Sequence, residues 1–95
     1  MNGELTFSGF RRVDPYVGQQ IKSMAADFFM RLKKSHRSLS HLHIHVKPVH
    51  RRTHNEKYEL HARALADDLY KSEKVSYNPF SGTADLLEQL KAAMD

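Results

Sequence analysis

Cysteine is absent from this chain of 95 residues. Without thiols the protein forms no disulfide, thiolate nucleophile or cysteine-ligated metal centre, so any metal would need histidine and carboxylate ligands. Long hydrophobic runs are absent too, because no apolar stretch approaches the roughly 20 residues that span a bilayer. Residues 1–6 show no basic flank before a hydrophobic segment. We therefore expect no membrane span, no signal peptide and a cytoplasmic location.

Signatures of catalysis are also missing. The sequence contains no glycine-rich phosphate loop, no HExxH pattern and no glycine elbow around a serine. Asp67 and Asp68 fall in a predicted turn, where local hydrogen bonds account for both carboxylates without acid–base chemistry. We therefore expect a binding protein and not an enzyme, with no catalytic residue, no cofactor, no metal and no small-molecule substrate.

Linkers, internal repeats and low-complexity segments do not appear either. Hydrophobic residues make up 40% of the chain and charged residues 27%, which is an ordinary globular composition. A chain of this length can form one modest core but not two. The sequence therefore predicts a single domain over residues 1–95.

Acidic residues are missing from the middle of the chain. The net charge is +4, but the excess is concentrated in residues 28–55, which contain no Asp or Glu. The basic residues of this segment are Arg31, Lys33, Lys34, Arg37, Lys47, Arg51 and Arg52. Such a run is either a solvated surface or a contact for a polyanion, and we favour the polyanion.

Hydrophobic spacing predicts the secondary structure. Leu5 and Phe7 alternate with polar residues, which indicates a strand at about residues 4–10. Asp14 and Pro15 are typical of a helix start, and apolar residues at spacings of three and four predict a helix of about twenty residues. Three further strands are predicted at about 41–47, 58–65 and 74–77. A second helix is predicted from Pro79 to Met94.

This order predicts an α+β fold, β-α-β-β-β-α, with a four-stranded mixed sheet. A right-handed crossover makes the first two strands parallel neighbours. Both helices should cover the one apolar sheet face. We expect core positions at Phe28, Phe29, Leu42, Ile44, Val46, Tyr58, Leu60, Ala62, Val75, Tyr77 and Phe80. We expect the opposite face to expose His43, His45 and His61.

Histidine alternates with aliphatic residues along the second predicted strand, at His41, His43 and His45, and His61 falls on the next strand. Three interpretations remain open for this face. The histidines could simply be solvent-facing, they could bind a divalent metal, or they could contact RNA through hydrogen bonds and stacking. Their ordinary pKa near 6.5 would add positive charge as the pH falls.

Two motifs carry a resemblance to a known family. Phe7-Ser8-Gly9 with the basic pair Arg11-Arg12 before the first helix resembles the start of the ribosome hibernation-promoting factor family, in its short form. Asn78-Pro79-Phe80, followed by Leu86, Leu87 and Leu90, is similar to the start of that family's second helix. The family's β-α-β-β-β-α domain is related in shape to double-stranded RNA-binding domains.

The resemblance implies a ribosome-associated translation inhibitor that acts in stress. Its partner would be the small ribosomal subunit, contacted through ribosomal RNA near the decoding channel. The alternatives are a generic structured-RNA-binding domain and a histidine-rich metal-binding protein. The residues that we expect to contact RNA are Arg11, Arg12, Arg31, Lys33, Lys34, Arg37, His43, His45, Lys47, Arg51, Arg52, His61 and Arg63.

Overall fold

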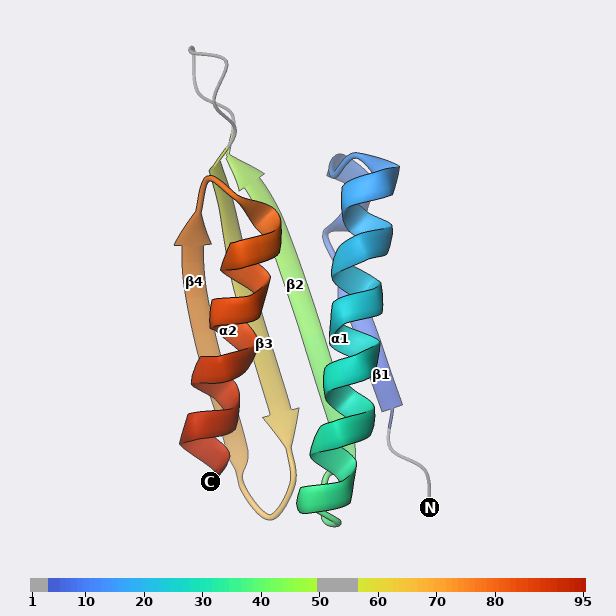
Figure 1. Cartoon of the computed structure of the whole chain (residues 1–95), viewed down its shortest axis with the longest axis vertical. Helices are drawn as coiled ribbons and strands as arrows, with labels where there is room; N and C mark the ends of the chain where they lie inside the picture. Colours follow the sequence, from blue (N-terminus) through green and yellow to red (C-terminus); the bar gives the residue numbers. More distant parts are fainter. Residues whose placement is uncertain (1–3, 50–56) are drawn as a thin grey trace.

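The computed structural model describes residues 4–49 and 57–95. Its elements follow the predicted β-α-β-β-β-α order, with one short 3-10 helix added after the first strand (Figure 1). They are β1 (Glu4–Ser8), η1 (Phe10–Arg12), α1 (Pro15–Ser35), β2 (His41–Val49), β3 (Lys57–Leu65), β4 (Leu69–Ser76) and α2 (Pro79–Met94). The predicted α+β class is therefore confirmed.

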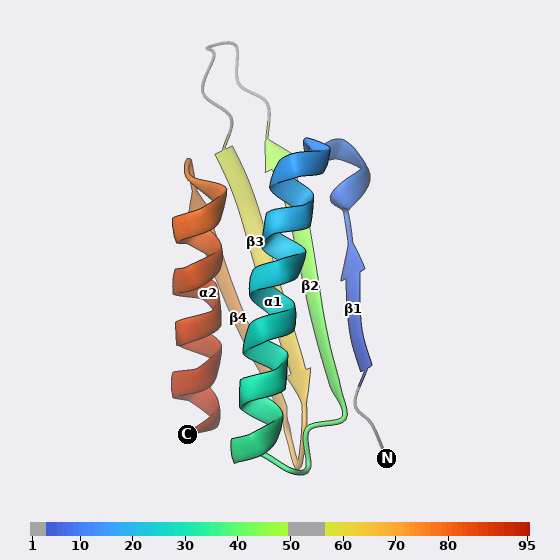
Figure 2. The ribbon, with the colours of Figure 1, turned by 45° about the vertical axis from the view of Figure 1, so that its right-hand side comes forward.

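The four strands form one mixed sheet in the order β1-β2-β3-β4. β1 runs parallel to β2, as the crossover through α1 requires, and the two other pairs are antiparallel. Figures 1 and 2 show α1 and α2 side by side over the same sheet face. One face is thus covered by helices, and the other, here called the open face, is not.

Both helices begin at the predicted caps. The Asp14 carboxylate accepts hydrogen bonds from the backbone N–H groups of Tyr16 and Val17, at 2.9 and 3.4 Å, and Pro15 occupies the first helical position. The Asn78 side chain caps α2 in the same way, ahead of Pro79. A proline costs nothing there because the first N–H groups of a helix have no intrahelical partner.

The covered face carries the core. Leu42, Ile44, Val46, Leu60 and Ala62 are all 0% exposed, as predicted. Phe28, Phe29 and Tyr58 are also buried, which confirms their assignment to the core. The prediction that Phe80 belongs to the core was wrong. Its side chain is 36% exposed in the first turn of α2. The helices contribute fully buried side chains to this layer, among them Ile21, Leu86 and Leu90.

β1 is shorter than predicted, since it ends at Ser8 and not near residue 10. Gly9 follows with φ +81°, a left-handed conformation that favours glycine. A Cβ atom at this position would lie 2.0 Å from the carbonyl oxygen of Val46, so only a hydrogen atom fits. The chain turns here against β2 and continues into η1.

β4 is longer than predicted, and the side chains that were predicted to face the helices lie on the opposite side of the sheet. It begins at Leu69, which pairs with Leu65 across the tight turn at Asp67 and Asp68. Val75 is 49% exposed and Tyr77, just beyond the strand, is 56% exposed, so their predicted inward orientation was wrong. The hairpin register determines which side chains face the helices, and these are Tyr70, Ser72, Lys74 and Ser76.

Polar residues are tolerated on the covered side of β4 because α2 provides partners. The Ser72 hydroxyl donates to the backbone carbonyl of Leu86 at 3.0 Å. Lys74 Nζ lies 3.5 Å from a carboxylate oxygen of Asp85. These contacts explain why the apolar alternation that indicates β2 and β3 is missing from β4.

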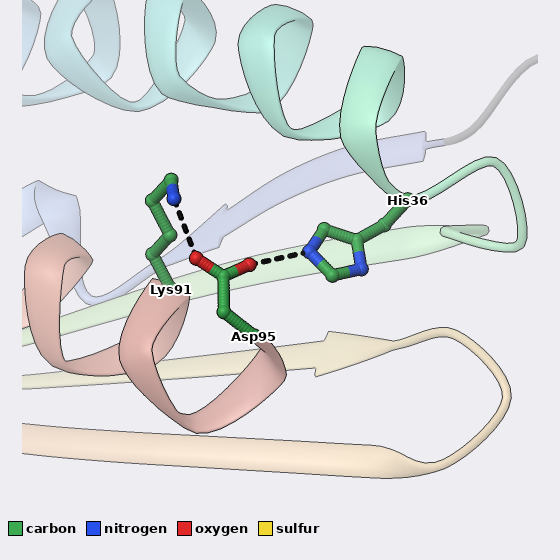
Figure 3. Close-up of polar contacts among 3 residues, drawn as sticks. All are labelled: His36, Lys91 and Asp95. Atoms are coloured by element: carbon green, nitrogen blue, oxygen red, sulfur yellow. Dashed lines mark hydrogen bonds and ion pairs between the residues drawn. The ribbon is translucent and has the colours of Figure 1, made fainter.

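The C-terminal ends of the two helices are joined through Asp95 (Figure 3). One carboxylate oxygen lies 2.9 Å from His36 Nε2, at the end of α1, and the other accepts from Lys91 Nζ. The hydrogen bond from Lys91 and then that from His36 lower the pKa of Asp95. This contact closes the helical layer at one end of the sheet.

Candidate nucleic-acid interface

The open face carries most of the histidines of the described residues. Strand pairing orders its side chains in rows that cross all four strands. The central row consists of Thr6, His43, Arg63 and Lys71. One neighbouring row consists of Glu4, His41, Leu65 and Leu69, and the other of Ser8, His45, His61 and Glu73.

Hydroxyl and imidazole groups alternate along β1 and β2 and form a continuous hydrogen-bonded chain. The Thr6 hydroxyl lies 2.9 Å from His41 Nε2 and 2.6 Å from His43 Nδ1. The Ser8 hydroxyl lies 2.8 Å from His43 Nε2 and 2.7 Å from His45 Nδ1. We call these five residues the histidine–hydroxyl array.

The parallel register of β1 and β2 produces the array. It sets Thr6 opposite His43 and Ser8 opposite His45, so each hydroxyl falls between two imidazoles of the same face. Thr6 and Ser8 were not among the predicted site residues. Their period-two spacing was visible in the sequence, but only the register between strands more than 30 residues apart in the chain brings them to the histidines.

The predicted exposure of the histidines is corrected by this packing. His43, His45 and His61 are half-buried and not fully exposed, since neighbouring rings and hydroxyls cover part of each side chain. Burial lowers the pKa of His43, and the charges of His41, His45 and Arg63 lower it further. His43 therefore resists protonation more than a histidine in water does.

His61 lies beside the array, and none of the array's four hydrogen bonds involves it. Its ring centroid is 5.9 Å from that of His45, and its Nδ1 lies 3.5 Å from a carboxylate oxygen of Glu73. Within residues 4–49 and 57–95, no three His, Asp or Glu side chains converge as a group that could hold a metal ion. The arrangement is one of hydrogen bonds and ring contacts, in which His41 and His43 are stacked and His45 and His61 are tilted.

Arg63 and Lys71 give the central row its permanent charge. Both side chains are exposed, and the pairing of β3 with β4 sets them opposite each other. Shallow hollows of about 470 and 390 Å³ lie on the two sides of Arg63. His41, His43 and Leu65 help to line the first, and His61, Lys71 and Glu73 help to line the second. Lys71 was not predicted as a site residue.

A second group of cations, here called the basic corner, lies where η1 meets α1. Arg11 and Arg12 are exposed, and they line a hollow of about 360 Å³ together with Lys22. Lys22 Nζ lies 5.5 Å from the ring centroid of Phe7 and 5.2 Å from that of Phe10. Lys22 was missed because it stands ten residues away in the sequence, on the second turn of α1.

A third group, the helix-end cluster, consists of Arg31, Lys33, Lys34 and Arg37. Arg31, Lys34 and Arg37 are exposed, whereas Lys33 is half-buried with its Nζ 5.3 Å from the Phe29 ring centroid. Figure 1 shows this end of α1 opposite to the end that carries η1. α1 has 21 residues and is about 30 Å long at roughly 1.5 Å per residue, which is the separation of Arg12 from Lys34 near its two ends. Lys22 and Arg31, both within α1, lie closer together.

Of the remaining predicted residues, the structure describes Lys47, near the end of β2. Lys47 is exposed on the open face and pairs in register with Glu59. Arg51 and Arg52 lie outside the described residues. The described members of the predicted set therefore do not form one patch, because they are distributed over the open face, the basic corner and the helix-end cluster. None of the helices in the described part of the chain is both long and apolar enough to cross a membrane.

Comparison with known proteins supports the fold. No family model matches the sequence, and no curated protein matches it. The structure is similar to that of a ribosomal subunit interface protein from Coxiella burnetii, with a TM-score of 0.56 and 14% sequence identity. The similarity covers 98% of this chain and 92% of the other. At this identity the two proteins share a fold across nearly their whole length.

Proposed function

We propose that this protein binds the small ribosomal subunit through its ribosomal RNA and acts as a hibernation-type inhibitor of translation. The observation that carries the proposal is the shared fold with a ribosomal subunit interface protein over nearly the whole of both chains. The motifs around Gly9 and Asn78, which resemble the hibernation-promoting factor family, point the same way. The site of action would be the cytoplasm.

The distribution of charge supports RNA as the partner. Cations lie at the basic corner, on the central row of the open face and at the helix-end cluster, up to about 30 Å apart. A small anion cannot contact groups at this separation, whereas a folded RNA presents phosphates over such distances. Lys and Arg contacts to phosphates provide affinity without reading bases, so shape and context determine the target.

Inhibition would follow from position and not from chemistry. The family resemblance implies a place near the decoding channel, where a bound domain blocks messenger and transfer RNA. The proposed role therefore needs a stable surface and no catalytic group.

The proposal is tested by sedimenting the purified chain with ribosomal subunits from the cells that express it. We expect the chain to travel with the small subunit in a sucrose gradient, and excess duplex RNA should not displace it. Equal binding to the small subunit, the large subunit and free duplex RNA would replace the proposal with a generic structured-RNA binder. Absence of the chain from the subunit fractions at low salt would contradict both.

A further inference from the structure

The histidine–hydroxyl array has a limited number of positions for hydrogen atoms. Four O···N contacts join its members, and each contact holds one hydrogen. Two outer nitrogens, His41 Nδ1 and His45 Nε2, can hold one hydrogen each. Three neutral imidazoles and two hydroxyls supply five hydrogens for these six positions.

The count leaves room for one more proton. One excess proton fills the sixth position while all four contacts stay hydrogen-bonded and both hydroxyls still donate inside the array. It can be passed from ring to ring through Thr6 and Ser8 without loss of a contact. A second excess proton forces one hydroxyl hydrogen out of the array and adds a second positive charge. The array thus accepts one proton more readily than two.

We propose that this array takes up a single excess proton and that the proton completes, with Arg63 and Lys71, a binding site on the open face for the phosphodiester groups of RNA. This inference rests on the function proposed above and takes RNA as the ligand from it. The central row is suited to phosphate since it has two permanent cations and no carboxylate, whereas each neighbouring row contains one, Glu4 or Glu73.

The charges around the array decide where the proton resides. In the free protein the lowered pKa of His43, caused first by burial, disfavours the proton at the centre of the array, and a phosphate held by Arg63 and Lys71 on the central row would favour it there. At one end the carboxylate of Glu4 lies 3.8 Å from His41 Nδ1. The titratable and charged groups that neighbour the array are Glu4 on β1, Arg11 and Arg12 on η1, Lys22 on α1, Lys47 on β2, Glu59, His61 and Arg63 on β3, and Lys71 and Glu73 on β4.

The proton capacity is tested on the free protein, without ribosomes. Histidine ring ¹⁵N shifts are followed by NMR from about pH 8 to about pH 5 in the unmodified chain and in Thr6→Val/Ser8→Ala, which keeps the shapes but removes both hydroxyls. We expect the unmodified array to take up its second proton about one pH unit below the first, because one hydrogen bond is worth about that much. In the variant the steps should merge. His36, outside the array, serves as the internal control.

The phosphate site is tested with a short oligouridylate, whose phosphodiesters do not titrate in this pH range. Affinity should rise about two- to fivefold as the array is protonated, the scale of one exposed charge, and by linkage the uptake should peak at about 0.2–0.4 proton per complex. Arg63→Gln should weaken binding at every pH. Array histidines that protonate independently of Thr6 and Ser8, or an affinity that does not change with pH, would overturn the inference. Both measurements use no ribosomes, so they still test this inference if the chain fails to bind ribosomal subunits. The two proposals can therefore fail separately.

Discussion

Along β2, successive residues alternate between two environments of the same sheet. Leu42, Ile44 and Val46 are 0% exposed beneath the helices, whereas His41, His43 and His45 are half-buried on the open face. The covered side is held by burial of apolar surface, which is not directional. The open side is ordered by directional hydrogen bonds of 2.6–2.9 Å between hydroxyl oxygens and imidazole nitrogens. One strand thus carries the core on one face and, in the proposed function, a recognition surface on the other.

The largest expected effect comes from breaking the covered side. Ile44→Ala removes three methyl or methylene groups from a position with 0% exposure and should lower the free energy of unfolding by about 2–5 kcal/mol. His45→Ala, the next residue on the open face, should cost about 1 kcal/mol, since it loses one hydrogen bond to Ser8. Urea unfolding of both variants measures the difference. Equal costs at the two positions would contradict the division between the faces.

Glycine substitutions test the turn at Gly9, where the chain leaves β1 and packs closely against β2. Gly9→Ala should lower the free energy of unfolding by about 1–3 kcal/mol, because φ is +81° and the added Cβ would meet the Val46 carbonyl oxygen. Gly18→Ala is the matched control, since its Cβ would lie 3.4 Å from the Phe10 ring and α1 gains helix propensity there. The control should be neutral or stabilising by up to about 1 kcal/mol. A tolerated Gly9→Ala would show that the turn can be built differently.

A smaller effect should appear in the pH dependence of stability. The pKa of His43 is lowered in the folded state, so below about pH 6.5 the unfolded chain binds a proton that the folded chain resists. The free energy of unfolding should therefore fall as the pH drops from about 6.5 towards the lowered pKa, and this contribution should be constant above that range. His43→Gln should flatten the fall. Identical pH profiles for the two proteins would contradict a lowered pKa of His43 in the folded state.

The covered face was predictable from sequence because its signal is local. The alternation in residues 41–47 indicated which side chains are buried, and Asp14 and Asn78 marked both helix starts. β4 was misread, since its helix-facing residues Ser72 and Lys74 are polar and depend on partners in α2. In that strand the register of the β3–β4 hairpin, and not hydrophobicity, determines which side chains face the helices.

The candidate site was only partly predictable, for a different physical reason. The types of its residues were visible as an acid-free, histidine-rich segment, but their grouping depends on contacts between distant segments. Thr6 and Ser8 join the histidines through the parallel β1–β2 register. Lys22 joins Arg11 and Arg12 through the packing of α1 beside η1. Neither contact has a signature in a short sequence window.

The open face as the RNA-contacting surface is tested most directly by the salt dependence of binding to the small ribosomal subunit. Arg63→Gln/Lys71→Gln lowers the net charge by two on the open face, and Ser23→Glu/Ala26→Glu lowers it by two at exposed positions of α1. We predict that the open-face variant binds more weakly, with a plot of log affinity against log salt that is shallower by about 1.4–1.8, two phosphates at about 0.7–0.9 each. The α1 variant should keep the slope of the unmodified chain. The same affinity and slope in both variants would contradict the account.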